Sequence, residues 1–166
     1  PEIEHMPDEE WLRTVEVDLT APFKMSRAVI PIMRKQRFGR IINIASIAAW
    51  RTGFFSGSPY TASKAGMLGL TRHLAVEEGE NGITVNAVAP GPIATPLFTA
   101  ANPPDAPRTR AIVEAIPVGR MGTPEDVAQA VSFFSTNDSV LAALSQTTGL
   151  PRPCSTTASA PISPAC

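Results

Sequence analysis

The chain has few of the residues that most often carry chemistry at a protein site. Its 166 residues include one tyrosine, three lysines, two histidines and two cysteines. Cys154 and Cys166 both lie near the C-terminal end, and their spacing fits neither a metal site nor a redox motif. We expect His5 and His73 to be surface or helix-face residues, and no carboxylate–histidine cluster argues for a metal, so the sequence predicts no metal centre.

Strong charge and long apolar runs are also missing. The net charge is −1 at pH 7, with 17% charged residues, and the basic residues are scattered. The sequence therefore predicts no surface for nucleic acid or phospholipid. No apolar stretch reaches the length of a membrane span, and no signal peptide is evident. We expect a cytoplasmic protein with no nucleic-acid partner and no membrane association.

The single tyrosine, Tyr60, stands four residues before one of the three lysines, Lys64. Residues four apart share a face of a helix, so the phenol and the ammonium would point into the same space. A neighbouring cation favours the phenolate and makes the phenol a usable proton donor or acceptor near neutral pH. Taken alone, the pair could equally be a half-buried tyrosine beside a solvated lysine. The flanking segments decide between these interpretations.

Two apolar segments flank this pair, and each ends in residues suited to a ligand site. Residues 41–45 are typical of a short buried strand. Ser46 follows at the carboxyl end, where open α/β sheets bind ligands, and it could donate to a substrate oxygen or simply end the strand. Residues 83–89 predict a second strand, which runs into a Pro-Gly turn. The glycine permits close approach of the backbone to a ligand, and Thr95 adds a hydroxyl.

In this order, the strand ending in serine, the Tyr-x-x-x-Lys helix and the strand ending in Pro-Gly-x-x-x-Thr resemble the catalytic half of a classical short-chain dehydrogenase/reductase (SDR), in particular its 3-oxoacyl-ACP reductase-like members. The resemblance covers residues 8–138. It implies an α/β fold with a Rossmann-like doubly wound parallel sheet, present only as its C-terminal half. It also implies that Tyr60 is the general acid/base, that Ser46 polarises the substrate oxygen, and that Lys64 assists Tyr60 and holds the nicotinamide ribose.

The resemblance further implies a cofactor, a substrate class and an oligomer. The cofactor is expected to be NAD or NADP, and the expected binding residues are Tyr60, Lys64, Pro90, Gly91, Ile93 and Thr95. The substrate is expected to be a small molecule with a carbonyl or a secondary alcohol. Helices over 8–36 and 60–80 carry apolar faces through which family members pair, so a homodimer or homotetramer is implied for the intact protein. Alternatively, these faces only cover the sheet.

Two features depart from the family pattern. The gap between Ser46 and Tyr60 is slightly longer than usual, and the glycines and proline in this loop can absorb the difference. Asp18 stands where the family normally has an asparagine that bends the helix and holds a water in the proton relay. An ionised carboxylate accepts hydrogen bonds but does not donate them. We expect Asp18, near the Lys64 cation, to belong to the catalytic set and to reduce activity without abolishing it.

The cofactor-phosphate loop of the family is missing. No Gly-x-x-x-Gly-x-Gly pattern follows any predicted strand, although such a turn at a helix N-terminus binds the pyrophosphate in this type of fold. The chain begins directly with the equivalent of the family's fourth helix, so about 80 residues are expected to be absent upstream. We interpret residues 1–138 as a partial catalytic domain that lacks the N-terminal dinucleotide phosphate-binding unit.

Residues 139–166 differ in composition from the rest of the chain. They are rich in serine, threonine, proline and alanine with little periodicity, which is typical of disorder. The closing Thr-Gly-Gln and Asp-Gly-Gly runs of the family are missing, whereas a one-base shift across residues 154–158 can encode Phe-Asp-Asp-Gly. We therefore hypothesise a frameshift in or shortly after residues 137–145. A natural low-complexity tail is the alternative.

The pattern along the chain predicts four helices and two strands. The helices cover residues 8–36, 60–80, about 108–116 and 124–136, and the strands cover residues 40–45 and 83–89. The proline-rich stretch 102–107 lies where family members carry a mobile substrate lid. The apolar residues near it suit either a modest hydrophobic substrate or packing on the core, and they are Leu97, Phe98, Ile112 and Ile116.

The leading functional prediction is an NAD(P)-dependent oxidoreductase that transfers a hydride between nicotinamide and a carbonyl or secondary alcohol, with Tyr60 moving the proton. One alternative is a catalytically inactive remnant that acts only through its helix-pairing surface. Another is an epimerase or dehydratase that recycles a bound nicotinamide. Net consumption of NAD(P)H separates the first prediction from the last.

Overall fold

A computed structural model describes residues 2–51, 57–137 and 144–146. Its centre is a parallel sheet in the order β1-β2-β3, formed by β1 (Gly39–Ile44), β2 (Ile83–Ala89) and β3 (Leu144–Gln146). The β1–β2 register runs from Gly39 opposite Ile83 to Ile44 opposite Val88. Because the strands are parallel, their carboxyl ends meet at one edge of the sheet, where ligands of open α/β sheets bind.

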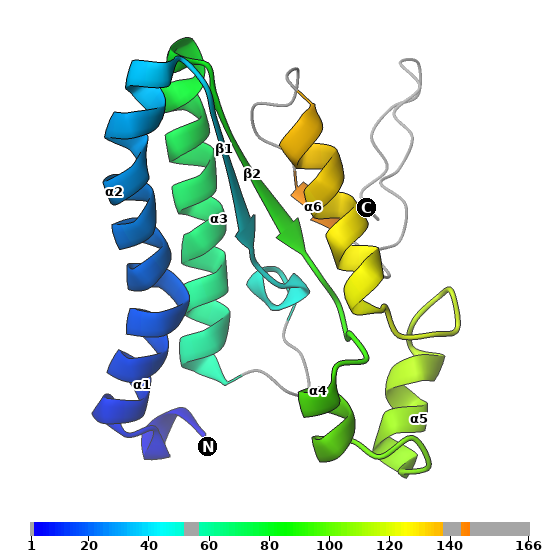
Figure 1. Ribbon diagram of the computed structural model, residues 1–166. Helices are drawn as coiled ribbons and strands as arrows, with labels where there is room; N and C mark the ends of the chain where they lie inside the picture. The colour runs from blue at the N-terminus through cyan, green and yellow to red at the C-terminus, as the bar shows by residue number, and fades with distance from the viewer. Residues whose placement is uncertain (1, 52–56, 138–143, 147–166) are drawn as a thin grey trace, which may run out of the picture.

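Helices lie on both sides of this sheet (Figure 1). The N-terminal arm comprises the short η1 (Ile3–His5), α1 (Asp8–Val15), one π-helical turn η2 (Glu16–Thr20) and α2 (Ala21–Gln36). The long α3 (Ser58–Glu78) packs beside α2. The single turns η3 (Ile47–Ala49) and η4 (Gly79–Asn81) come before and after α3 in the chain. The remaining helices are α4 (Pro96–Ala101), α5 (Pro107–Glu114) and α6 (Pro124–Thr136), of which α6 packs on β1 and β2.

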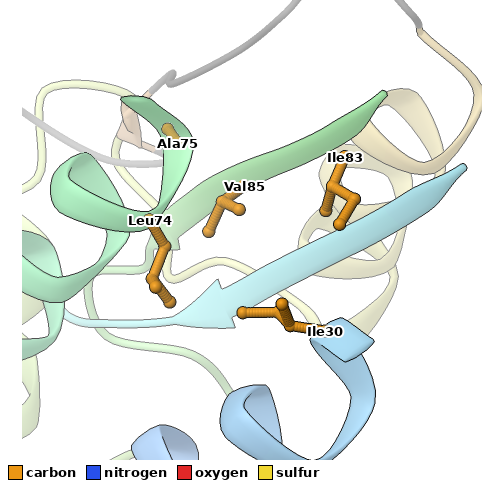
Figure 2. Close-up of a cluster of buried hydrophobic side chains, with 5 residues drawn as sticks. All are labelled: Ile30, Leu74, Ala75, Ile83 and Val85. Atoms are coloured by element: carbon orange, nitrogen blue, oxygen red, sulfur yellow. The ribbon is translucent and has the colours of Figure 1, made fainter. Parts of the chain in front are cut away.

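The core joins α2, α3 and the sheet. Figure 2 shows one buried cluster in which side chains of α2 and α3 pack against those of β2, formed by Ile30, Leu74, Ala75, Ile83 and Val85. A second cluster continues along α3 towards the carboxyl end of the sheet, and it is formed by Ala45, Met67, Leu68, Ala87 and Ala89. All seven residues of β2 are buried. The contacts between α3 and the buried central strand therefore hold the start of α3 near the edge of the sheet where ligands bind.

A glycine sets the entry into the central strand. Gly82 has φ +74°, a left-handed backbone conformation that residues with a side chain rarely adopt. A Cβ there would lie 2.3 Å from the carbonyl oxygen of Arg37. Glycine is the residue that tolerates both conditions. This close approach brings the end of α2 beside the start of β2.

The predicted strand 83–89 and helix 124–136 match β2 and α6, while other bounds differ. Helix 8–36 is interrupted by the π-turn η2, and β1 and α3 each begin slightly earlier than expected. Helix α4 was missed because it is short and follows a loop. Regular structure was not expected beyond residue 138, yet β3 lies there, where it pairs with the backbone of β2. The remainder of that predicted tail lies outside the described residues, and the frameshift stays a hypothesis.

An ion pair ties α2 to the end of α3. Arg34 donates from Nε to Oε2 of Glu78 at 2.8 Å and from Nη2 to its other oxygen, and Asn81 donates to Oε2 at 3.2 Å. The Glu78 side chain is 1% exposed. The Arg34 guanidinium holds the pKa of this carboxyl below its usual value. A carboxyl group with a lowered pKa stabilises the fold at pH values above its ordinary pKa of about 4.3. This stabilisation is lost as the pH falls below that value.

Replacing Arg34 with methionine is expected to lower the free energy of unfolding by about 2–3 kcal/mol, because it leaves the buried Glu78 carboxylate without its counter-charge. Denaturant unfolding measures the loss. Lys24→Met is the matched control, since it breaks an ion pair to Glu16 whose two side chains are each 54% exposed, and it should cost less than about 1 kcal/mol. The double variant Arg34→Met/Glu78→Leu should regain most of the loss. Equal costs for the two single variants would contradict this account.

Within residues 2–51 and 57–137, no helix combines the length and the apolar character needed to cross a membrane.

Candidate active site

Ser46 lies where β1 and β2 end. The residue before it, Ala45, donates its backbone N–H to Val88 at 2.7 Å, and the residue after it, Ile47, donates to the carbonyl of Pro90 at 3.1 Å. These two bonds place Ser46 beside the start of the Pro-Gly segment. The Ser46 Oγ accepts from the N–H of Ala48 at 3.1 Å as the cap of η3. Among the described residues, its own hydrogen therefore remains available for a ligand oxygen.

Lys64 connects three parts of the site. Its Nζ lies 3.1 Å from the carbonyl oxygen of Ile44 at the end of β1 and 3.2 Å from Oδ1 of Asp18 in η2. The same nitrogen is 5.5 Å from the centre of the Tyr60 ring. The residue is 9% exposed. The Lys64 ammonium is therefore held by two oxygen atoms beside the Tyr60 ring.

The π-helical turn and a glycine on α3 bring Asp18 to this cation. A Cβ on Gly66 would lie 2.8 Å from Cδ2 of Leu19, so the Leu19 side chain of η2 packs closely over the glycine on α3. The extra residue in a π-turn shifts the side chains that follow it, and such turns are frequent at functional sites. Asp18 is thereby placed beside Lys64, with its side chain 24% exposed.

Tyr60 occupies the first turn of α3, which begins at Ser58 after the cap Gly57. It is half-buried. The turn η3, which Ser46 caps, packs against α3. The structure therefore brings together the elements that carry Ser46, Tyr60, Lys64 and Asp18 at the carboxyl edge of the sheet. The catalytic roles of these residues stay predictions.

The Pro90–Thr95 stretch leaves this edge and runs to α4. Its carbonyl at Pro92 and its N–H at Ala94 pair with Gly122, and Ile93 and Gly122 form a parallel bridge. Thr95 caps α4, because its Oγ1 accepts from the N–H of Phe98 at 3.2 Å. The Thr95-Pro96 pair is a sequence signal for this helix, since threonine at the cap and proline in the first turn mark helix starts.

The apolar residues near the expected lid separate into two groups. Ile112 and Ile116 are 8% and 6% exposed, so they pack on the core, whereas Leu97 is 84% exposed and Phe98 is partly buried. Leu97 on α4 therefore remains the candidate for contact with an apolar substrate.

Glu2, Glu4 and His5 are exposed, and their ligand atoms lie within 4.8 Å of one another. This carboxylate–histidine trio was not anticipated from the sequence. Exposed acidic groups of this kind are common without a metal, and the absence of a metal centre stays a prediction.

Comparison with known proteins assigns the family. Residues 1–143 match the family model described as enoyl-(acyl carrier protein) reductase. The chain is 41% identical over 133 residues to the 3-oxoacyl-[acyl-carrier-protein] reductase FabG of Haemophilus influenzae, covering 80% of this chain and 53% of that protein. It is 42% identical over 133 residues to the acetoacetyl-CoA reductase of Rhizobium meliloti, covering 80% and 54%. The chain therefore belongs to the SDR family and is of the 3-oxoacyl-ACP reductase type.

Solved structures agree on the fold. A 3-oxoacyl-[acyl-carrier protein] reductase from Brucella melitensis superposes with a TM-score of 0.79 at 35% identity, covering 87% of this chain and 53% of that one. A putative 2-deoxy-d-gluconate 3-dehydrogenase from Agrobacterium tumefaciens with bound NADP gives 0.80 at 35%, covering 88% and 60%. The predicted Rossmann-like fold is confirmed. The chain spans about half the length of the relatives that it matches.

Proposed function

We propose that the protein is an NAD(P)-dependent oxidoreductase that interconverts a carbonyl and a secondary alcohol, with Tyr60 as the general acid/base. The observation that carries this proposal is the position of Lys64, whose buried ammonium is anchored by Asp18 and the Ile44 carbonyl close to the Tyr60 ring. A fixed cation next to a phenol stabilises the negative charge that develops on the phenol oxygen during proton transfer.

The donors of the site fit the nicotinamide half of the cofactor. An ammonium has three N–H donors, and Asp18 and Ile44 take two of them, so among the described residues one is left for a ribose hydroxyl. Related structures carry NAD in a Brucella melitensis reductase and NADP in the Agrobacterium tumefaciens protein, which supports either cofactor. Pro90, Gly91, Ile93 and Thr95 are the proposed lining of the nicotinamide. When bound, the nicotinamide supplies the hydride.

The residues of this chain then provide binding and proton transfer. In the reduction direction, Ser46 Oγ donates a hydrogen bond to the substrate oxygen and polarises the carbonyl. Tyr60 gives its phenolic proton to that oxygen as negative charge develops there, so the products are a secondary alcohol and a phenolate. Lys64 stabilises the Tyr60 phenolate until the phenolate takes a proton from water. Asp18 holds the ammonium in place and offsets part of its charge.

The proposed substrate is a 3-oxoacyl thioester. The relatives named above act, by their names, on 3-oxoacyl-[acyl-carrier-protein] or acetoacetyl-CoA, and Leu97, two residues after Thr95, offers an exposed apolar surface. We further propose a homodimer or homotetramer that pairs through the N-terminal helices and α3. Exposed apolar residues on these helices support this, and they are Leu12, Val17, Met25, Ile32 and Val76. A cytoplasmic location stays a prediction.

The test is the loss of reduced nicotinamide absorbance when the protein is mixed with acetoacetyl-CoA and either NADPH or NADH. The proposal expects consumption that is stoichiometric with the 3-hydroxyacyl product. Turnover of substrate without net consumption would favour an epimerase or dehydratase. A stable dimer that neither binds nor consumes the cofactor would support the inactive remnant and contradict the proposal.

Asp18→Asn is expected to raise kcat by about tenfold, because it removes a carboxylate that offsets the Lys64 charge while keeping an oxygen that can accept the Lys64 hydrogen bond. Initial rates at saturating substrate and cofactor measure the effect. Glu16→Gln is the matched control, since it removes a carboxylate from the same turn, where that group pairs with Lys24 and not with the site. A rate for Asp18→Asn equal to that of Glu16→Gln, or lower, would show that Asp18 does not moderate the cation.

A further inference from the structure

The Pro90–Thr95 stretch is held from outside the sheet by a single glycine. Gly122 donates its N–H to the carbonyl of Pro92 at 3.0 Å and accepts from the N–H of Ala94 at 2.8 Å. The pair of bonds forms a parallel bridge between Ile93 and Gly122 that belongs to none of the three strands. The backbone of the proposed nicotinamide lining is therefore fixed on both sides of Ile93.

A side chain at position 122 would meet the end of the Ile93 side chain. A Cβ built on Gly122 would lie 2.5 Å from Cδ1 of Ile93, and because real Cβ contacts essentially never fall under 3.0 Å, the flexible end of the Ile93 side chain would have to move. The next nearest atoms, Oδ2 of Asp126 and the carbonyl oxygen of Pro92, are both 3.8 Å away, which is ordinary contact. The conflict is thus confined to one methyl group. The missing side chain at 122 is what allows Ile93 to occupy its present position.

Gly122 itself is fixed by the start of α6. The next residue, Thr123, caps the helix in a reciprocal pair, because its N–H donates to Oδ2 of Asp126 at 2.9 Å and its Oγ1 accepts from the N–H of Asp126 at 3.2 Å. Arg120 donates to the same carboxylate at 2.8 Å. This arginine and the Thr123 N–H lower the pKa of Asp126 to about 2. Since α6 packs on β1 and β2, Gly122 is attached to the same framework as Ser46.

We propose that Gly122 is a positioning residue for the nicotinamide, acting through Ile93. The inference rests on the proposed function in so far as Ile93 lines the cofactor. It goes further by assigning the placement of that lining to a glycine before α6, outside the Ser-Tyr-Lys set and the Pro-Gly segment. The close approach at Gly122 makes the position of Ile93 sensitive to one added methyl group. A displacement of about 1 Å in a reacting assembly can cost as much as a hundredfold in rate.

The first readout is hydrogen exchange of the backbone around residue 94, which needs no cofactor. Gly122→Ala should speed exchange of the Ala94 amide by about tenfold, since it weakens the bridge bond that protects it. Gly39→Ala is a control with an even more severe conflict elsewhere, as its Cβ would lie 2.5 Å from Sδ and 2.9 Å from Cβ of Met33. Gly69→Ala is a benign control, with its nearest atom at 4.0 Å. Neither control should change exchange at Ala94 beyond its effect on global unfolding.

The second readout is the affinity for NADPH, which is measured through the fluorescence of the bound NADPH. Gly122→Ala should raise Kd by about tenfold, and adding Ile93→Val should restore most of the affinity and the exchange protection, because valine lacks the Cδ1 atom in conflict. A merely structural role would give a loss that Ile93→Val does not reverse.

The two readouts separate this inference from the proposed function. Unchanged exchange at Ala94 in Gly122→Ala, or no rescue by Ile93→Val, overturns the positioning role. If exchange responds and is rescued while the wild-type chain binds no reduced nicotinamide, the positioning of Ile93 by Gly122 stands and the proposed function fails.

Discussion

Tyr60→Phe is expected to lower kcat for carbonyl reduction by about a thousandfold, the size of effect associated with loss of a general acid/base. The variant keeps the aromatic ring beside Lys64 and removes only the hydroxyl, so binding of the cofactor should change little. Tyr60 is the only tyrosine of the chain, and no other phenol can take over its role. Initial rates and cofactor titrations measure the two quantities separately.

Two other results would contradict this role. A Tyr60→Phe variant with at least a tenth of the wild-type rate would exclude Tyr60 as the proton donor. An equal loss of cofactor binding and of rate would assign Tyr60 to binding alone. Ser46→Ala provides the comparison, because it removes one hydrogen bond to the substrate oxygen while leaving the proton donor in place, and we expect it to cost less than Tyr60→Phe does.

Lys64→Met is expected to lower kcat by about a hundredfold and also to weaken the binding of NADPH. The methionine retains an unbranched side chain but removes the charge that stabilises the phenolate and the donor proposed for the ribose. It also leaves the Asp18 carboxylate without its ion-pair partner at 3.2 Å. The variant should therefore unfold at a lower denaturant concentration than the wild type. Kinetics, titration and denaturant unfolding measure the three effects.

The double variant Lys64→Met/Asp18→Asn separates stability from catalysis. With both charges removed, the unfolding midpoint should recover towards that of the wild type, since no uncompensated charge remains beside the helix. The rate should stay low, because the cation is still absent. Recovery of the rate together with the stability would show that Lys64 acts only as a structural partner of Asp18.

Local signals were sufficient where short-range interactions determine the structure. The bounds of β2 and α6 follow from a run of β-branched residues after Gly82 and from the cap at Thr123, and both agree with the structure. The order of strand, helix and strand also places Ser46 and the Pro-Gly turn at the same sheet edge, because parallel strands share that edge. The start of α4 is marked in the sequence by the Thr95-Pro96 pair, but the helix itself is too short to show periodicity.

Contacts between distant segments could not be predicted from the sequence. Arg34 and Glu78 are 44 residues apart, and nothing in their local patterns shows that they form an ion pair. The approach of Gly122 to Ile93 depends on how α6 packs on the sheet, so the glycine looks like an ordinary loop residue in the sequence. Asp18 was expected near Lys64 from the family resemblance alone. The π-turn and Gly66 give the physical reason for that proximity.

The most direct test of the account is the mass of the product formed from acetoacetyl-CoA when both hydrogens on the reactive carbon of the NADPH nicotinamide are replaced by deuterium. The account predicts a 3-hydroxyacyl product that carries the deuterium on its alcohol carbon, with formation lost in Tyr60→Phe. An unlabelled alcohol, an isomerised or dehydrated substrate, or labelled product that forms equally well in Tyr60→Phe would contradict it.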